Sequence, residues 1–449
     1  MNNKLRFVAT FCAFVVPFIA APAPCDAQET TFMRIEDGFV ERIEQNYEVI
    51  PDGSLTLDAE VGSVRVDSWT NDGMEIRIEK RVRARLEERA RTAFDEIEVI
   101  LSQRDNNVRI EVVDVRPSSF FRERASVEIA VRVPEFCTLD LRTVDGSIEI
   151  ENTKGPVTAN AVNGDIEIGP ADSKITAGTT DGNIEIADVK GSITASAMDG
   201  DIEINGTIGQ VAARTIDGDI EIRNTQGNVE ANAVDGSVEI ARTTGDVFAR
   251  TTDGDIEVRN TQGAVDVKTV DGRIETMTTE SNVDASTLEG DIGLFDARGY
   301  VSAQAARGSI EVGVARTRRG SGSNNTGKPS LPTYAESPDT VPPDADSPDS
   351  GQDQETLLEL ETSEGDVTIY LPSALAASIE AEGSSGGLLL SRLWRDEVGH
   401  IYSDFGLNQS EWGVFFYIQS EASGEINGGG DRIRLRTNSG NIYIKEKNR

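Results

Sequence analysis

The sequence predicts an all-β fold, a parallel β-solenoid in which 18-residue coils stack along one axis. Glycines recur every 18 residues without a slip, small residues lie midway between them, and apolar residues alternate after each glycine. Strands this short, joined by four-residue corners without helices, cannot form a doubly wound sheet. They can pair coil upon coil at a spacing of about 4.8 Å. The usual hand of parallel crossovers predicts a right-handed coil.

The regular repeats occupy residues 137–316. One position of the repeat is always glycine: Gly146, Gly164, Gly182, Gly200, Gly218, Gly236, Gly254, Gly272, Gly290 and Gly308. The midway position holds Gly155, Gly191, Gly209, Gly227, Gly245, Gly263 and Gly299, with Ser173 and Ser281 in the two gaps. The module is therefore nine residues long, and two modules make a coil. The second and fourth residues after the glycines are apolar, as at Ile220 and Ile222, with Thr276 the exception, which predicts a strand with one buried face.

The Asp-Gly pairs predict the corners. Glycine adopts positive φ without a steric penalty, and Asp or Asn side chains hydrogen-bond nearby backbone donors in turns. We therefore expect the residue before each glycine to brace its corner. These residues are Asp145, Asn163, Asp181, Asp199, Asp217, Asp235, Asp253 and Asp271.

Residues 1–27 have the layout of a secretory signal peptide. Lys4 and Arg6 precede an apolar run at residues 7–21, and small residues end at Ala27. We expect cleavage after Ala27 and export to the periplasm, the cell surface or the medium, with no membrane span afterwards.

Cysteine use fits an exported chain without disulfides. Pro24 disfavours an acyl anchor at Cys25, and removal of the leader also removes Cys12. Cys137 then remains alone, so no intrachain disulfide is possible. Cys137 lies nine residues before Gly146, at a corner position, which favours an inert buried thiol over a reactive one.

Residues 28–136 are expected to form looser first coils and a cap. The stretches beginning at Gly62 and Gly73 carry the same glycine and alternation. Leu86, Ala90 and Phe94 are four residues apart, which predicts a short helix with a narrow apolar stripe across the end of the solenoid. A cap is needed because an open sheet end is a template for strand addition.

The composition changes sharply at residues 317–355. This stretch is rich in Pro, Ser, Asp and Gly and poor in apolar residues, which predicts a disordered insertion. Strand patterns resume in residues 356–449 with GDVTIYLP and end with GDRIRLRTNSGNIYIKE. The insertion is therefore expected to interrupt the solenoid and not to end it.

The period-nine G-x-I-x-I motifs, the opening GSLTLDAEVGSVRVDSW and the close RIRLRTNSGNIYIKE together resemble a bacterial "putative-adhesin" family of β-strand repeat proteins, domain of unknown function 4097, also called Toastrack. The resemblance runs from about Asn46 to Lys445, without the insertion. It implies an exported β-solenoid that acts in adhesion or as an assembly platform in the cell envelope. It implies no catalytic residues and no cofactor.

One outward position forms a column of acids, which we call the glutamate column: Glu149, Glu167, Glu185, Glu203, Glu221, Glu239, Glu257 and Glu275. A solvated acidic face is one interpretation. The other is a site for Ca²⁺, a glycan or a cationic partner, shared with the residues directly after the glycines: Asp165, Asp201, Asp219, Asp255 and Asp291. The doubled glycine of calcium-binding nonapeptides is missing, which favours the first interpretation.

Enzymatic chemistry finds little support. His400 is the only histidine, so a zinc cluster or a Ser-His-Asp triad would depend on it alone. Arg214, Arg250 and Lys268 share one repeat position, as a polysaccharide-active solenoid would need, but an 18-residue coil is too short to build a walled cleft. Solvated charges are the simpler interpretation.

Aromatic residues gather near the C-terminus: Trp394, Phe405, Trp412, Phe415, Phe416 and Tyr417. Alternation in EWGVFFYIQS directs Trp412 and Phe416 to one side and Phe415 and Tyr417 to the other. A capping layer is one interpretation, and a partner patch at Phe415 and Tyr417 is the other.

The net charge excludes one class of partner. The chain carries 78 acidic and 43 basic residues, a formal net charge of −35. Such a chain repels phosphate backbones and anionic membranes. The sequence therefore predicts a non-enzymatic exported solenoid that presents a repetitive surface to an envelope or cell-surface protein or glycan, with no nucleic acid as partner.

Overall fold

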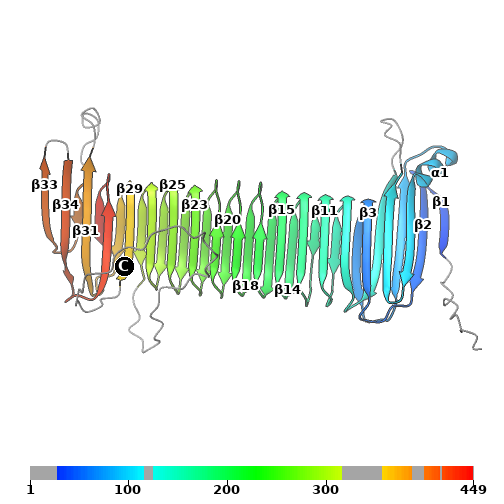
Figure 1. The fold of residues 1–449 in the computed structure, drawn as a ribbon, viewed down its shortest axis with the longest axis horizontal. Helices are drawn as coiled ribbons and strands as arrows, with labels where there is room; N and C mark the ends of the chain where they lie inside the picture. Colours follow the sequence, from blue (N-terminus) through cyan, green and yellow to red (C-terminus); the bar gives the residue numbers. More distant parts are fainter. Residues whose placement is uncertain (1–27, 116–124, 316–355, 387–398, 415–416, 448–449) are drawn as a thin grey trace, which may run out of the picture.

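The computed structural model describes residues 28–115, 125–315, 356–386, 399–414 and 417–447. Two long β-sheets lie face to face and run the length of the molecule, with the helix α1 at one end and β33 at the other (Figure 1). The predicted signal peptide (1–27) and insertion (317–355) lie outside the described residues. Within the described ranges, no helix has both the length and the apolarity to cross a membrane.

The regular coils contribute one strand to each sheet. The first sheet, called the isoleucine sheet here, contains β10 (Ile148–Glu151), β12 (Ile166–Ile168), β14 (Ile184–Lys190), β16 (Ile202–Ile208), β18 (Ile220–Gln226), β20 (Val238–Thr243), β22 (Ile256–Thr261), β24 (Ile274–Thr279), β26 (Ile292–Ala297) and β28 (Ile310–Val314). The second, the alanine sheet, contains β9 (Thr138–Asp145), β11 (Val157–Asn163), β13 (Ile175–Asp181), β15 (Ile193–Asp199), β17 (Val211–Arg214), β19 (Val229–Asn232), β21 (Val247–Arg250), β23 (Val265–Asp271), β25 (Val283–Glu289) and β27 (Val301–Arg307).

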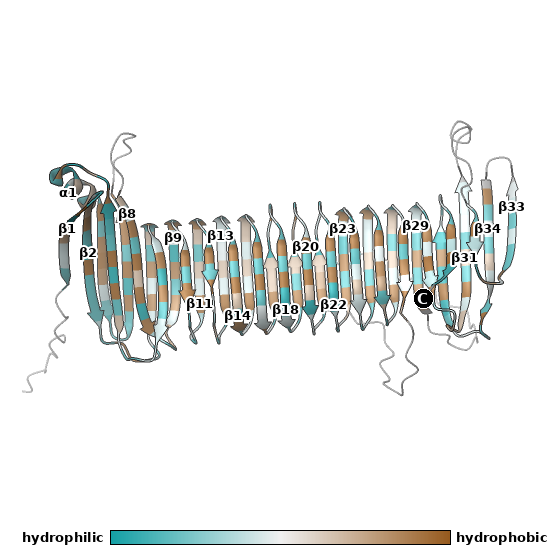
Figure 2. Cartoon of the chain, turned by 180° about the vertical axis from the view of Figure 1, so that it is seen from behind, coloured by the Kyte–Doolittle hydropathy of each residue, from teal (hydrophilic) through white to brown (hydrophobic). Residues whose placement is uncertain are grey.

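The regular strands pair in parallel with the strands one coil away, in constant register apart from a shift between Phe295 and Ala297 where β26 pairs with β28. Ile220 stands between Ile202 and Val238, and Glu221 stands between Glu203 and Glu239. The apolar positions predicted from the alternation are buried, and Figure 2 shows hydrophobic and hydrophilic residues alternating along the strands. Large side chains such as Ile220 and Ile222 of one sheet face smaller ones such as Val229 and Ala231 of the other. The parallel β-solenoid is confirmed.

The Asp-Gly corners are tighter than the sequence indicated. Gly218 has φ of +143°, and a Cβ added there would lie 2.3 Å from the carbonyl oxygen of Gly200 one coil below. Both the backbone angle and the close approach require glycine. The midway position tolerates serine at Ser173 and Ser281.

At most corners of the regular coils the brace comes from the residue after the glycine, and the prediction that it comes from the residue before was wrong. Asp219 Oδ1 accepts the backbone N–H of Ser237 at 2.7 Å, and Asp201 Oδ1 accepts that of Asp219 at 2.8 Å. From inside the corner, the hydroxyl of the buried Thr215 donates to the carbonyl of Gly200 at 3.1 Å. Side chains thus replace the ladder bonds that the corner interrupts. Asp217, which precedes Gly218, is exposed.

The N-terminal end departs from simple coils. β3 (Ser54–Val61) and β4 (Ser63–Trp69) stack in parallel on β9 and β10, as the glycine at Gly62 predicted. β5 (Met74–Val82) is antiparallel to both β2 (Gly38–Tyr47) and β8 (Ala125–Pro134), so the prediction of a coil at Gly73 was wrong. The other strands of this end are β1 (Glu29–Ile35), β6 (Ile97–Arg104) and β7 (Asn107–Asp114).

The predicted helix is present as α1 (Glu87–Asp95) at this end. Ala90, Ala93 and Phe94 are buried, and Lys80 Nζ donates to the carbonyls of Phe94 and Ile97. Leu86 was expected on the buried stripe, but it is the N-cap residue and is exposed.

The C-terminal end doubles back on the stack. β29 (Thr356–Glu364) and β30 (Val367–Leu371) continue the coils, pairing with β27 and β28. The last strands, β35 (Asp431–Thr437) and β36 (Ile442–Glu446), insert next to them. Outside these lie β31 (Ala377–Gly386), β32 (Ile401–Ser403), β33 (Asn408–Val414) and β34 (Tyr417–Ile426).

Candidate functional site

The glutamate column runs along the outer face of the isoleucine sheet, and arginines neutralise part of it. Arg223 forms ion pairs with Glu221 and with Glu239, the latter at 3.4 Å, and Arg259 pairs with Glu257. At the start of the column Glu149 pairs with Arg65. Glu167, Glu185 and Glu203 are exposed in the adjoining coils, and Glu275 is partly buried. The column is therefore mixed in charge and not a continuous row of free carboxylates.

The aspartates after the glycines are already used in the fold. Asp165, Asp201, Asp219, Asp255 and Asp291 each accept a backbone N–H from the next coil, at 2.7–2.8 Å. A cation would have to share these oxygens with the amides that stabilise the corners. Among the described residues no group of three or more His, Cys, Asp or Glu side chains is arranged to hold a metal ion.

A second acidic column lies at the residue before each glycine. Asp181, Asp199, Asp217, Asp235, Asp253 and Asp271 stand side by side in consecutive coils, and we call them the aspartate column. All six are exposed, and none has an ion-pair partner within the part of the chain that the structure describes. Unit charges about 4.8 Å apart repel by about 0.9 kcal/mol in water. The aspartate column therefore carries a continuous row of uncompensated charge, whereas arginines neutralise part of the glutamate column.

An exposed apolar column lies directly beside the aspartate column, where the strands of the alanine sheet run into the Asp-Gly corners. Its members share the position two residues before the glycine, and they are Val144, Val162, Met198, Ile216, Val234, Val270 and Leu288. Their exposed fractions range from 41% at Val162 to 54% at Leu288. The core alternation and the charge pattern did not predict this column. The period-18 recurrence of apolar residues outside the two core positions was the signal that could have revealed it.

The basic residues proposed for carbohydrate chemistry do not form a site together. Arg214 pairs with Glu230 at 3.1 Å, and Lys268 pairs with Asp266 at 3.2 Å. Arg250 is exposed on the same outer face. They are surface charges that balance nearby acids, as the simpler interpretation predicted.

Cys137 and His400 have ordinary surroundings. Cys137 is fully buried at the corner beneath Gly155, and burial raises the pKa of its thiol to about 12, so it stays protonated and unreactive. His400 is partly buried, and its Nδ1 lies 3.3 Å from Glu411 Oε2.

The C-terminal aromatic residues are arranged differently from the prediction. EWGVFFYIQS is not one strand, because β33 ends at Val414 and β34 starts at Tyr417, antiparallel to it. Trp412 is 52% exposed and so forms no buried cap. Phe415 lies outside the described residues, as do Trp394 and Phe416, and Tyr417 is described only in its pairing with Val414 and Gly386.

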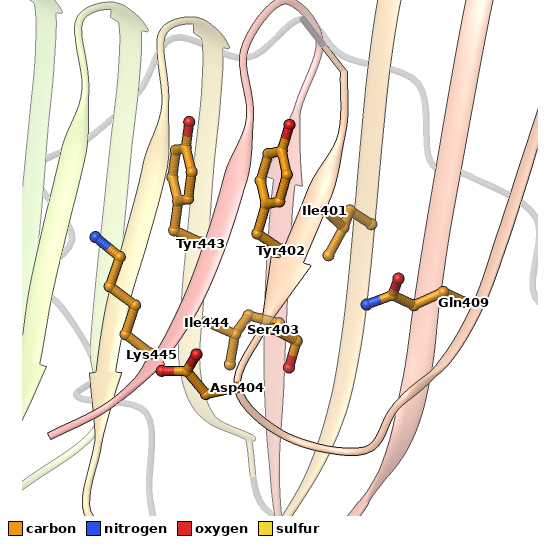
Figure 3. A pocket seen from close by; sticks show the side chains of 8 residues that line it. All are labelled: Ile401, Tyr402, Ser403, Asp404, Gln409, Tyr443, Ile444 and Lys445. Carbon is orange, nitrogen blue, oxygen red and sulfur yellow. The ribbon is translucent and has the colours of Figure 1, made fainter. Parts of the chain in front are cut away.

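A tyrosine pocket occupies the C-terminal end of the isoleucine sheet (Figure 3). Tyr402 and Tyr443 stack with ring centroids 5.2 Å apart and planes 10° apart. Lys445 Nζ lies 5.2 Å from the centroid of Tyr443, a cation–π contact. Asp404 and Gln409 add polar groups, and the pocket holds about 400 Å³. These residues come from β32, the segment that links it to β33, the start of β33, and β36, which is about 40 residues further along the chain.

Comparisons with known proteins agree with the repeat. The family model described as Toastrack DUF4097 matches residues 188–332, less of the chain than the predicted resemblance covered. No curated protein matches the sequence.

Three solved structures are similar in part. A "putative cell adhesion protein" from Clostridium sporogenes is 11% identical, with 90% of this chain and 99% of that chain covered and a TM-score of 0.14. A "putative adhesin" from Bacteroides fragilis is 17% identical, with 60% and 96% covered and a TM-score of 0.28. A "putative lipid binding protein" from Parabacteroides distasonis is 12% identical, with 60% and 96% covered and a TM-score of 0.24. The match of the Toastrack DUF4097 model confirms the predicted resemblance over residues 188–332.

Proposed function

We propose that this protein is an exported, non-enzymatic scaffold that presents a repetitive surface for adhesion or cell-envelope assembly. The observation that carries the proposal is the constant register of its outward side chains. The same residue type recurs at the same height of consecutive coils, as in the row Glu203, Glu221 and Glu239. Such columns offer many equivalent contacts to one partner, and many weak contacts add up to high avidity.

The leader-like sequence supports export. Residues 1–27 have the order of charged, apolar and small residues that a signal peptidase recognises. The mature chain is expected to start at Gln28, and N-terminal sequencing of the protein from fractionated cells tests this directly. A full-length chain in the cytoplasm would contradict the proposal.

Crosslinking in intact cells tests the scaffold function. A photo-reactive amino acid at the exposed Glu203 or Ile216 is expected to capture an envelope or cell-surface protein or glycan, which mass spectrometry identifies. The same amino acid at the fully buried Ile220 is the matched control and should capture only this chain. Turnover of acidic polysaccharides by the purified protein would show that it is an enzyme and would contradict the scaffold function.

Glycan binding is a second candidate, and the tyrosine pocket favours it over the acidic face. Tyr402 and Tyr443 offer aromatic rings beside the polar Asp404 and Gln409, a combination suited to a sugar with apolar and hydroxylated faces. Glycan-array binding that is lost in Tyr402→Ala with an unchanged melting temperature would support this candidate. Equal glycan binding by the wild type and by Tyr402→Ala would rule out the tyrosine pocket as the glycan site.

A further inference from the structure

The apolar column is not required by the fold. Thr180 and Thr252 occupy the same repeat position and are likewise exposed, so a polar side chain is compatible with the coil. Strand propensity would explain valine and isoleucine, but it does not favour Met198 or Leu288 over threonine. The core is filled separately by the inward side chains of the same strands. Apolar residues are thus kept on the surface where the structure accepts threonine, which is typical of a binding surface.

The neighbouring aspartate column defines the charge of the occupant. Asp199, Asp217 and Asp235 stand beside Met198, Ile216 and Val234, coil after coil. Cationic groups placed along this row would relieve the repulsion between the carboxylates. A second copy of this chain is a poor occupant, because its formal net charge is −35.

The repeat distance defines the shape of the occupant. Coils stack about 4.8 Å apart, so successive side chains of the apolar column are separated by a distance close to the 5.4 Å rise of one turn of an α-helix. An extended strand repeats its outward side chains every 6.6–6.8 Å or so and soon loses register. From Met198 to Val270 the column crosses five coils, roughly 19 Å, which a helix of about 13 residues covers.

We propose that the apolar column and the aspartate column together dock an amphipathic helix of a partner protein, with apolar residues on its contact face and Lys or Arg along one flank. The inference rests on the proposed scaffold function and adds the chemistry of its partner. The apolar side chains lie exposed where the strands of the alanine sheet run into the corners, and a helix packed against a sheet is a stable arrangement. The basic flank lies over the carboxylates.

A model peptide tests the proposal with the full-length mature protein. The probe is a helical peptide of about 14 residues made of Leu and Lys in amphipathic order, and its controls are a scrambled peptide of the same composition and a Leu/Glu version. Binding is measured by calorimetry at physiological salt. We expect the amphipathic Leu/Lys peptide to bind more tightly than the scrambled one, and the Leu/Glu peptide not to bind.

Protein variants locate the site. The triple variant Met198→Thr, Ile216→Thr and Val234→Thr copies residues that the column already contains and should fold, yet weaken binding by at least about tenfold. Ile208→Thr is the matched control, because Ile208 is 50% exposed like Ile216 but lies at the opposite corner of the coil. Changing Asp199, Asp217 and Asp235 to Asn should weaken binding and reduce its dependence on salt.

Several results would overturn the proposal. If the protein bound the amphipathic and the scrambled peptides with equal affinity, overall charge alone would explain the binding. The same conclusion would follow if the wild type and the triple threonine variant bound the amphipathic peptide with equal affinity. A change of oligomeric state in the triple variant would make a second copy the occupant. If the peptide fails while the intact-cell crosslinks still identify an envelope partner, the helix-docking proposal is wrong and the scaffold function stands. If both fail, the scaffold function is wrong as well.

Discussion

At the scale of single residues, an Asp-Gly corner such as the one at Gly218 is held by the side chains of Asp219 and Thr215. The composition of the repeat does not show which residues do this. In Asp-Gly-Asp both flanking residues are acidic, so residue type alone does not tell which one braces the corner. The pattern across coils is more informative. The position after the glycine also holds Ser147, Asn183 and Ser237, which share an acceptor oxygen with aspartate, and once it holds Arg273, which has none. In most coils, therefore, the residue that replaces aspartate keeps a hydrogen-bond acceptor.

The brace predicts opposite results for two neighbouring aspartates. Asp219→Ala leaves the N–H of Ser237 without its acceptor and should lower the free energy of unfolding by about 1 kcal/mol. Asp217→Ala removes one member of a like-charge row and should leave stability unchanged or slightly raised. Thermal or urea unfolding measures both. Asp219→Asn keeps the acceptor and should behave like the wild type. Equal destabilisation by the two alanine variants would contradict the assignment.

The opposite corner carries strain at one residue. Thr278 has φ of +57°, whereas the same position in other coils is held by Asn224 at +57° and Asn260 at +56°. A β-branched residue is disfavoured in this left-handed region, and asparagine is tolerated. Thr278→Asn should therefore stabilise the protein, by roughly 1 kcal/mol. The reverse change, Asn260→Thr, should destabilise it by a similar amount. Urea unfolding of the two variants checks the sign.

At the scale of elements, the two ends of the stack were only partly predictable. β5 alternates like a coil strand, with Met74, Ile76 and Ile78 buried, yet it pairs antiparallel on both sides. Alternation of apolar residues shows which face of a strand is buried, but it does not show whether the neighbouring strands run parallel or antiparallel to it. For the same reason, nothing in the sequence pattern shows that β35 and β36 insert between earlier strands. The short helix was predictable, because its apolar spacing is local.

The C-terminal end should show a dependence on pH through Glu380. Hydrogen bonds from Arg432, the shortest at 2.7 Å, hold the pKa of this carboxyl below its ordinary value of 4.5. A lowered pKa in the folded state means that the stabilisation is present above about pH 4.5 and is lost as the pH falls through the folded pKa. Glu380→Gln should lower the melting temperature at pH 7, and its difference from the wild type should shrink as the pH falls below about 4.5. A constant difference between the two proteins across this range would contradict the ion pair.

At the scale of the whole molecule, the fold was predictable because every coil repeats the same few requirements. Each coil contacts only its neighbours, so a local pattern fixes the stack once the period is found. The exposed surfaces were less predictable. The glutamate column was visible as a run of charges, but its pairing with Arg223 and Arg259 depends on side-chain geometry. The tyrosine pocket joins Tyr402 to Tyr443 through an end region whose strand order the sequence does not specify.

Removal of whole coils tests this account of the fold. Deletion of residues 219–236 joins Gly218 to Ser237, which takes the position of Asp219, and every later strand keeps its sheet. The variant should fold cooperatively and be shorter by about 4.8 Å in maximum dimension by small-angle X-ray scattering. Its melting temperature should change little, since one equivalent interface replaces two.

Deletion of half a coil should fail where deletion of a whole coil succeeds. Loss of residues 219–227 moves Val229 and Ala231 of the alanine sheet onto the positions of Ile220 and Ile222 in the isoleucine sheet. All later coils then place small residues where large ones belong, and the αL residue Arg242 no longer falls in register with Gly206 of the coil before the deletion. Voids and lost corner bonds follow, and these are costly in a packed core. The shorter deletion should therefore be the less stable protein, although it removes fewer residues. If both deletions unfolded alike by circular dichroism, the 18-residue coil would not be the unit on which this fold is built.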